Sequence, residues 1–166
     1  MHPPSSITST SCGAVTRCEV TTDVLDAAEL LEAVRSPLAG AAVLFVGSVR
    51  EFTGEGDAIH RTDCLTYESY VPMAEKEMRA ILTAAATKWS LTHAAAVHRI
   101  GTLELGELAV VVAVSSPHRD ASFEAGREVL EQIKRSVPIW KKDHSADGTA
   151  WVDPGRTLSP VDEGSR

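Results

Sequence analysis

Residues Leu130–Asp143 read LEQIKRSVPIWKKD, and this stretch carries the pattern from which fold and site can be inferred. Pro138 ends any helix that runs into it, because the proline ring clashes with the preceding turn and has no N–H. We therefore expect a helix before Pro138 and a strand after it. Lys134 then projects from the last helical turn and Lys141 from the start of a strand packed beside that helix. The stretch gathers cations where the chain reverses.

The rest of the chain is acidic. Its 166 residues contain 16 Lys and Arg against 23 Asp and Glu, a net charge of −7, whereas residues 134–142 alone contain four of the sixteen basic side chains. We expect a single domain of this length and, from the charge, neither general nucleic-acid binding nor binding to anionic membranes. A local basic cluster in an acidic protein indicates an anionic ligand.

Cysteine usage and hydropathy indicate a cytoplasmic protein. The chain has three cysteines, an odd number, and no CxxC pair, which favours a reducing compartment over a disulfide scaffold. Residues 1–15 lack the basic start and apolar core of a secretory signal. No apolar run approaches the ~20 residues that span a bilayer.

Helical and strand-like segments alternate, which predicts an α+β fold. We expect a disordered segment at 1–17, one folded domain at 18–153 and a flexible tail at 154–166. Helices alternating with paired strands favour a mostly antiparallel sheet of the split βαβ kind, with the helices packed on one face. Helices are expected at 26–35, 71–89 and 121–136, and strands at 17–22, 41–49, 62–70, 93–99, 102–105, 108–115, 139–144 and 150–152.

Three local expectations can be checked against the structure. Asp26 and Glu29 have the spacing of a helix capping box. Gly47, inside an apolar strand, indicates close approach of another backbone or of a ligand. The third helix should turn four apolar side chains inward, namely Phe123, Val129, Leu130 and Ile133.

Polar residues gather at the ends of the predicted elements, where rigid helices and strands can aim them into one pocket. Arginine offers phosphate a planar fork and lysine a point charge, and crowding of cations lowers a lysine's pKa. The candidate residues are Ser48, Val49, Arg50, His118, Arg119, Lys134, Lys141, Lys142 and Asp143.

Each candidate also has a structural explanation. Lys134 could simply complement a helix dipole, and Lys141–Lys142 could be a solvated strand end. His118 could lie on the surface. His98 and Tyr67 are interpreted as structural residues, and Cys64 as an inert core thiol. The histidines lack metal-motif spacing, so no metal site is expected.

Six stretches of the chain resemble the large, catalytic subunit of molybdopterin synthase, over about residues 18–153. They are FVGSVR (45–50), YESYVPMAEKEM (67–78), HRIGTLELGE (98–107), VAVSSPHRDASFEAG (112–126), LEQIKRSVPIWKKD (130–143) and DGTAWV (147–152). The block KxxVPIWKK, preceded fifteen residues earlier by SxHR, is the most specific of them.

The resemblance implies an α/β hammerhead fold with a ferredoxin-like part, and a sulfurtransferase activity. The family converts cyclic pyranopterin monophosphate into molybdopterin by installing two sulfurs as a dithiolene. The sulfur arrives as a thiocarboxylate on the C-terminal glycine of a small ubiquitin-like subunit. The family's enzyme is a heterotetramer built on a central homodimer of large subunits. No cofactor is implied.

Carried over by position, the family's substrate pocket falls on all nine candidate residues, with Lys134 and Lys141 as the catalytic pair. On this interpretation Lys134 meets the partner's terminal carbonyl, and Lys141 orients substrate or protonates the leaving oxygen. Arg50, His118 and Arg119 hold phosphate and pterin. Asp143 departs from the family's usual Glu, and its shorter side chain puts a direct substrate contact in doubt.

Two other readings stay open at this point. The chain could be a ferredoxin-like module that binds a ubiquitin-like partner or a phosphorylated ligand without catalysis. It could also be a structural relic that has lost its chemistry, although the intact candidate residues argue against that.

Overall fold

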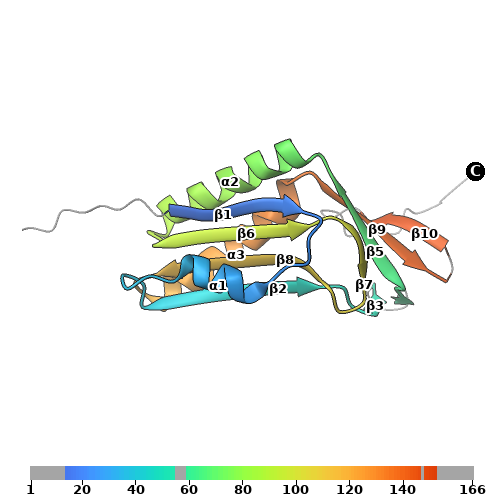
Figure 1. The fold of residues 1–166 in the computed structure, drawn as a ribbon, viewed down its shortest axis with the longest axis horizontal. Helices are drawn as coiled ribbons and strands as arrows, with labels where there is room; N and C mark the ends of the chain where they lie inside the picture. Colours follow the sequence, from blue (N-terminus) through green and yellow to red (C-terminus); the bar gives the residue numbers. More distant parts are fainter. Residues whose placement is uncertain (1–13, 55–58, 147, 153–166) are drawn as a thin grey trace, which may run out of the picture.

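The computed structural model describes residues 14–54, 59–146 and 148–152. In these residues the chain forms three helices and ten strands (Figure 1). Their order is β1 (Ala14–Thr21), α1 (Ala27–Val34), β2 (Ala41–Ser48), β3 (Phe52–Thr53), β4 (His60–Arg61), β5 (Cys64–Ser69), α2 (Val71–Lys88), β6 (His93–Arg99), β7 (Gly101–Glu104), β8 (Leu108–Ser116), α3 (Arg119–Ser136), β9 (Ile139–Ser145) and β10 (Gly148–Val152).

The larger body of the molecule is a four-stranded sheet with helices on both faces. Its strand order is β1-β6-β8-β2, and only the β1–β6 pair of this sheet is parallel. Even-numbered residues of β6 and β8, such as Ala96 and Val112, pack against α2 and α3. Odd-numbered ones, such as Val97 and Val111, pack against α1. The α+β class is confirmed, but the expectation that all helices lie on one face is wrong for α1.

The second sheet, of order β10-β9-β5-β7, lies at one end of the first, and all its pairs are antiparallel (Figure 1). β5 leads directly into α2, and α3 leads through Pro138 into β9. Each of these two connections therefore joins a helix on the first sheet to a strand of the second. The strands β3 and β4 form a separate short pair beside them.

The N-terminal half of helix α3 lies close to the first sheet because small residues form its inner face there. The buried residues of α3 are Ser122, Ala125, Gly126, Val129 and Ile133. A Cβ built on Gly126 would lie 3.3 Å from a Val43 methyl carbon. Phe123 is 62% exposed, so the prediction that it faces inward is wrong. The helix also begins two residues earlier than expected, at Arg119.

The local expectations are confirmed in part. The Asp26 carboxylate caps α1 by accepting from the backbone N–H groups of Ala28 and Glu29. The Glu29 side chain does not complete a capping box and instead accepts from Arg17 at 2.9 Å. A Cβ added to Gly47 would lie 2.8 Å from a Val110 methyl carbon and 3.8 Å from the Val110 backbone oxygen, so its closest neighbour is a side chain of the adjacent strand.

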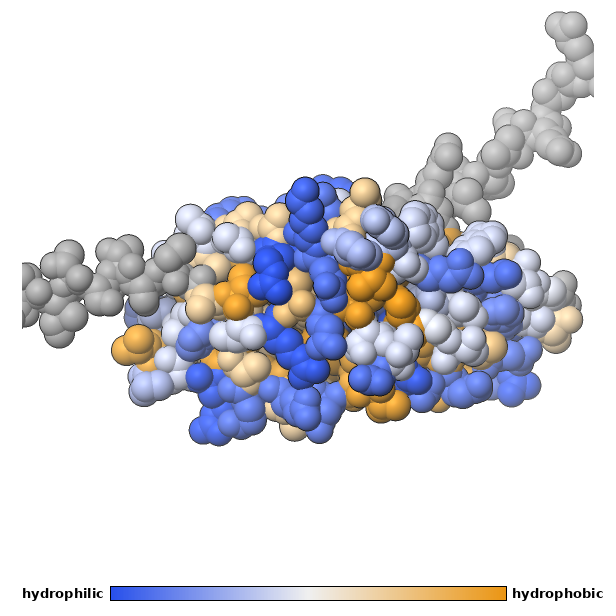
Figure 2. All heavy atoms as spheres, turned by 45° about the horizontal axis from the view of Figure 1, so that its top comes forward, coloured by the Kyte–Doolittle hydropathy of each residue, from blue (hydrophilic) through white to orange (hydrophobic). Residues whose placement is uncertain are grey.

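Residues 14–17, which were predicted to be disordered, belong to β1, which begins at Ala14 and pairs with β6. Residues 1–13 and the tail 154–166 lie outside the described residues. In the part that is described, no helix is long and apolar enough to cross a membrane. The face turned forward in Figure 2 carries hydrophilic residues interspersed with hydrophobic ones.

Candidate active site

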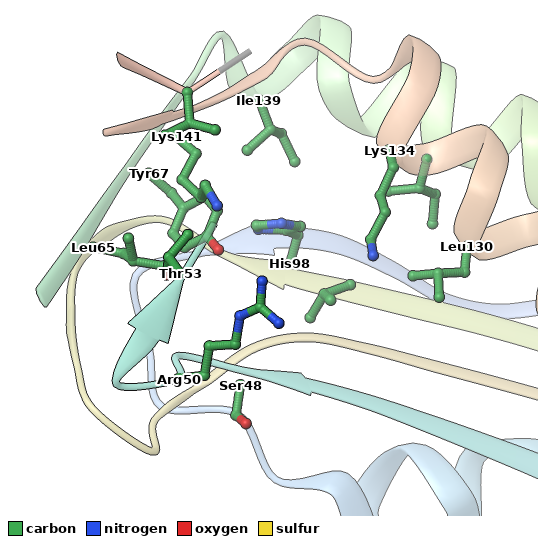
Figure 3. Close-up of a pocket in the computed structure, with 13 residues that line it drawn as sticks. Ser48, Arg50, Thr53, Leu65, Tyr67, His98, Leu130, Lys134, Ile139 and Lys141 are labelled. Atoms are coloured by element: carbon green, nitrogen blue, oxygen red, sulfur yellow. The ribbon is translucent and has the colours of Figure 1, made fainter. Parts of the chain in front are cut away.

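A cavity of about 460 Å³ opens where the C-terminal end of α3 meets both sheets (Figure 3). It combines residues from the first sheet, the second sheet, α3 and the segment after β2. Apolar side chains form much of its wall, and polar side chains from distant parts of the sequence face it. Its lining consists of Ser48, Arg50, Thr53, Leu65, Tyr67, His98, Val110, Leu130, Ile133, Lys134, Ile139, Lys141 and Val152.

Strand register explains why Lys141 reaches the cavity and Lys142 does not. Lys141 pairs with Tyr67 on one side and Val152 on the other, and all three line the cavity. Successive side chains of a strand point to opposite faces of a sheet. Lys142 accordingly projects the other way, and its Nζ lies 5.3 Å from the ring centroid of Trp151. Lys142 is therefore not brought into the predicted pocket.

Three cations converge on the cavity. Figure 3 shows Arg50, Lys134 and Lys141 reaching toward a shared space from three different elements. Burial lowers the pKa of Lys141, and the charges of Arg50 and Lys134 lower it further, against an opposing effect of Asp143. Among the described residues, none of the three cations forms an ion pair, whereas Arg17, Arg35, Arg61, Lys88 and Arg99 all do. Within the described ranges no carboxylate lines the cavity, and Asp143 acts on Lys141 from beside it.

Asp143 lies beside the cavity rather than in its lining. The residue is 2% exposed, and its Oδ2 accepts from the Thr62 hydroxyl at 3.1 Å and lies 3.2 Å from Nε2 of His60. Its Oδ1 has no partner in the described part of the chain. Its geometry supports an electrostatic role through Lys141 more than a direct substrate contact.

Replacing Asp143 with Asn should lower the pKa of Lys141 further, because the substitution removes a negative charge that raises it. The pKa can be followed by NMR titration of the labelled lysine side chain. Asp120→Asn, an exposed change at the opposite end of α3, is the matched control and should leave the titration of Lys141 unchanged. A rise in the Lys141 pKa, or no change, would contradict this role.

The structure does not bring every predicted residue together. Val49 is 2% exposed and packs in a small core cluster with Leu65, so it anchors the chain rather than lining the cavity. His118 and Arg119 are exposed at the first turn of α3. Lys134 follows Arg119 by fifteen residues of helix, which at 1.5 Å per residue is about 22 Å. One chain alone therefore cannot place Arg119 beside Lys134.

Two polar residues that sequence reasoning judged structural line the cavity. Tyr67 and His98 contact each other edge to face, with ring centroids 5.1 Å apart. Burial, followed by the charge of Asp143, raises the pKa of Tyr67 to about 12, so the phenol stays protonated. Tyr67 can be recognised as a cavity residue because it pairs with Lys141. This pairing depends on the register of β5 and β9, which the alternation of side chains along each strand does not determine.

Comparisons with known proteins identify the family of the chain. The family model described as MoaE protein matches residues 20–136. The Bacillus subtilis (strain 168) protein named Molybdopterin synthase catalytic subunit is 43% identical over 136 residues, or 82% of this chain and 84% of its own. A crystal structure of molybdopterin synthase from Staphylococcus aureus matches with a TM-score of 0.75 and 38% identity, covering 81% of this chain and 96% of that one.

A second solved structure, the molybdopterin biosynthesis MoaE protein from Burkholderia ambifaria MC40-6, has a TM-score of 0.70 and 31% identity, over 87% of this chain and 94% of that chain. The sequence matches cover most of both partners, and the structures share the fold. The chain therefore belongs to the MoaE protein family.

Proposed function

We propose that this chain is the catalytic subunit of a molybdopterin synthase, a sulfurtransferase of molybdenum cofactor biosynthesis. It would convert cyclic pyranopterin monophosphate into the molybdopterin dithiolene with sulfur from the thiocarboxylated C-terminus of a small ubiquitin-like subunit. One observation carries this proposal beyond family membership: Arg50, Lys134 and Lys141 face one cavity without ion-pair partners among the described residues. Both the substrate phosphate and the thiocarboxylate are anions that such a cavity would attract.

Within the cavity the cations have different surroundings, and the proposed roles follow from them. Lys134 extends from the exposed end of α3, where an incoming peptide tail can reach it, and would stabilise charge on the tail's terminal carbonyl as sulfur leaves. Lys141 is partly buried between Tyr67 and Val152. Its lowered pKa suits it to protonate the leaving oxygen of the substrate. Arg50 would hold the phosphate.

His118 and Arg119 remain part of the proposed site, but as residues of a second copy. The length of α3 separates them from Lys134 of their own chain by about 22 Å. The central homodimer implied by the family resemblance would let the first turn of one copy's α3 approach the cavity of the other. Both side chains are exposed, as residues that face a neighbouring subunit must be in an isolated chain.

The small subunit is the second proposed partner. The name "catalytic subunit" carried by the Bacillus subtilis relative describes one part of a larger enzyme. We place the enzyme in the cytoplasm, because Cys18 and Cys64 are both unpaired thiols.

Reconstitution tests the function directly. The chain is mixed with thiocarboxylated small subunit and cyclic pyranopterin monophosphate, and dithiolene is measured. The expected result is product formation that requires the thiocarboxylate, with an ordinary C-terminal carboxylate on the small subunit as the control. Binding of the partner and of the pterin without any product would instead support the non-catalytic binding module.

A further inference from the structure

His98 is a buried polar side chain in the cavity that the proposed mechanism does not use. It lies near the end of β6, on the face of the first sheet that continues toward α3, and is 8% exposed. In Figure 3 its imidazole lies centrally, with Arg50, Lys134 and Lys141 around it. The edge-to-face contact with Tyr67 fixes the orientation of the ring.

The hydrogen bonding of His98 defines which ring nitrogen carries the proton. Nδ1 lies 2.8 Å from the backbone carbonyl oxygen of Arg99. A carbonyl oxygen can only accept, so Nδ1 must donate. Burial lowers the pKa of His98 to about 4, although the bond to Arg99 opposes the shift, so the ring is neutral at physiological pH. A neutral imidazole has one N–H, and Nε2 therefore carries a lone pair.

No group in the described part of the protein donates a hydrogen bond to this lone pair on Nε2. Among the described residues, the one hydrogen bond of His98 is that of Nδ1. The imidazole lines the cavity and is 8% exposed, so a ligand that donates to Nε2 gains a hydrogen bond at a largely buried position. The surrounding cations would bind an anionic group of a ligand. Nε2 of His98 can then accept a hydrogen bond from a different part of the same ligand. The cavity therefore presents two kinds of recognition, positive charge and one neutral acceptor.

We propose that Nε2 of His98 accepts a hydrogen bond from an N–H of the pterin ring system and thereby orients the pterin while the cations hold the phosphate. The inference rests on the proposed function and adds a specificity residue to it. A pterin carries several N–H donors, whereas a terminal thiocarboxylate group offers only acceptors. The pterin can therefore donate a hydrogen bond to His98, whereas the thiocarboxylate group of the small subunit cannot.

Two substitutions distinguish this role from a structural one. His98→Gln places an amide oxygen near the position of Nε2, while His98→Asn keeps a donor near Nδ1 and offers nothing at Nε2. We expect His98→Asn to raise KM for cyclic pyranopterin monophosphate about tenfold, and His98→Gln to stay near the wild-type value. KM for the thiocarboxylated small subunit should not change in either variant. Equal KM values for the pterin in the two variants, or an increase in KM for the small subunit, would overturn the proposal.

A measurement on the unmodified protein keeps the inference testable if the variants fold poorly. In an ¹⁵N NMR spectrum of histidine-labelled protein, the Nε2 resonance of His98 should move upfield when cyclic pyranopterin monophosphate is added without the small subunit. It should stay in place when inorganic phosphate is added instead. A chain that makes dithiolene while this resonance does not respond to the pterin refutes the role of His98 alone. A chain that neither binds the pterin nor makes dithiolene refutes the proposed function with it.

Discussion

Lys141→Ala should lower kcat/KM for dithiolene formation by a factor of about a hundred or more, the usual cost of removing a preorganised charged group from a reacting centre. Lys141 is the most deeply placed of the three cavity cations, and its pKa is already lowered by burial and by its cationic neighbours. Alanine cannot donate a proton or balance charge in that position. The rate is measured by quantifying the dithiolene product with both substrates varied.

Lys142→Ala is the matched control for this experiment. It removes the same charge one residue along the same strand, but from the opposite face of the sheet, where Lys142 lies over Trp151. Its effect on the rate should be within a few-fold of wild type. If Lys141→Ala and Lys142→Ala have the same small effect, the cavity is not the reaction centre.

The contrast between these two lysines shows what the sequence could determine and what it could not. Alternation along a strand already places neighbouring residues on opposite faces. Which of the two faces the cavity depends on the pairing of β9 with β5 and β10, and that pairing is a long-range property. The same register brings Tyr67 opposite Lys141, so a residue that looked like strand packing became part of the site.

The fold could be predicted from the sequence better than the site, because nearby residues such as caps and prolines determine where its helices begin and end. Pro138 does follow the end of α3, and Asp26 caps α1 as its residue type predicts. The continuous apolar runs of the central strands also required cover on both faces of the sheet. That requirement was present in the sequence, and it accounts for the position of α1 on the face opposite α2 and α3. Phe123 was misplaced because small residues, Ser122 and Gly126, form the inner face of α3 near its N-terminal end.

The position of Arg119 follows from helix length, which the sequence also contains. A helix predicted over 121–136 already separates its two ends by more than about 20 Å. The predicted helix therefore already argued against convergence of Arg119 and Lys134 within one chain, and the observed start of α3 at Arg119 fixes their separation. Both residues can belong to the same site only if the site takes Arg119 from another copy of the chain.

The proposed homodimer, in which each site takes Arg119 from the other copy, predicts complementation between two inactive variants. Lys134→Ala and Arg119→Ala homodimers should each lose most activity, because each lacks one group at both sites. In a heterodimer of the two, one site lacks both groups and the other has an intact Lys134 from one copy and an intact Arg119 from the other. Co-expressed with different tags and purified through both, this heterodimer should recover about half of wild-type activity, since one of the two symmetric sites is whole.

The control is a heterodimer of Lys134→Ala with Lys141→Ala, made and purified in the same way. Both residues line the cavity of a single chain, so each of its two sites lacks one lysine and no activity should return. Recovery in this control would mean that the two lysines do not act within one chain. Failure of the Arg119 heterodimer to recover, in a dimer shown to be intact, would mean that Arg119 does not complete a neighbouring site. Because Arg119 cannot reach the Lys134 of its own chain, it acts either in the site of the other copy or in no site that contains Lys134.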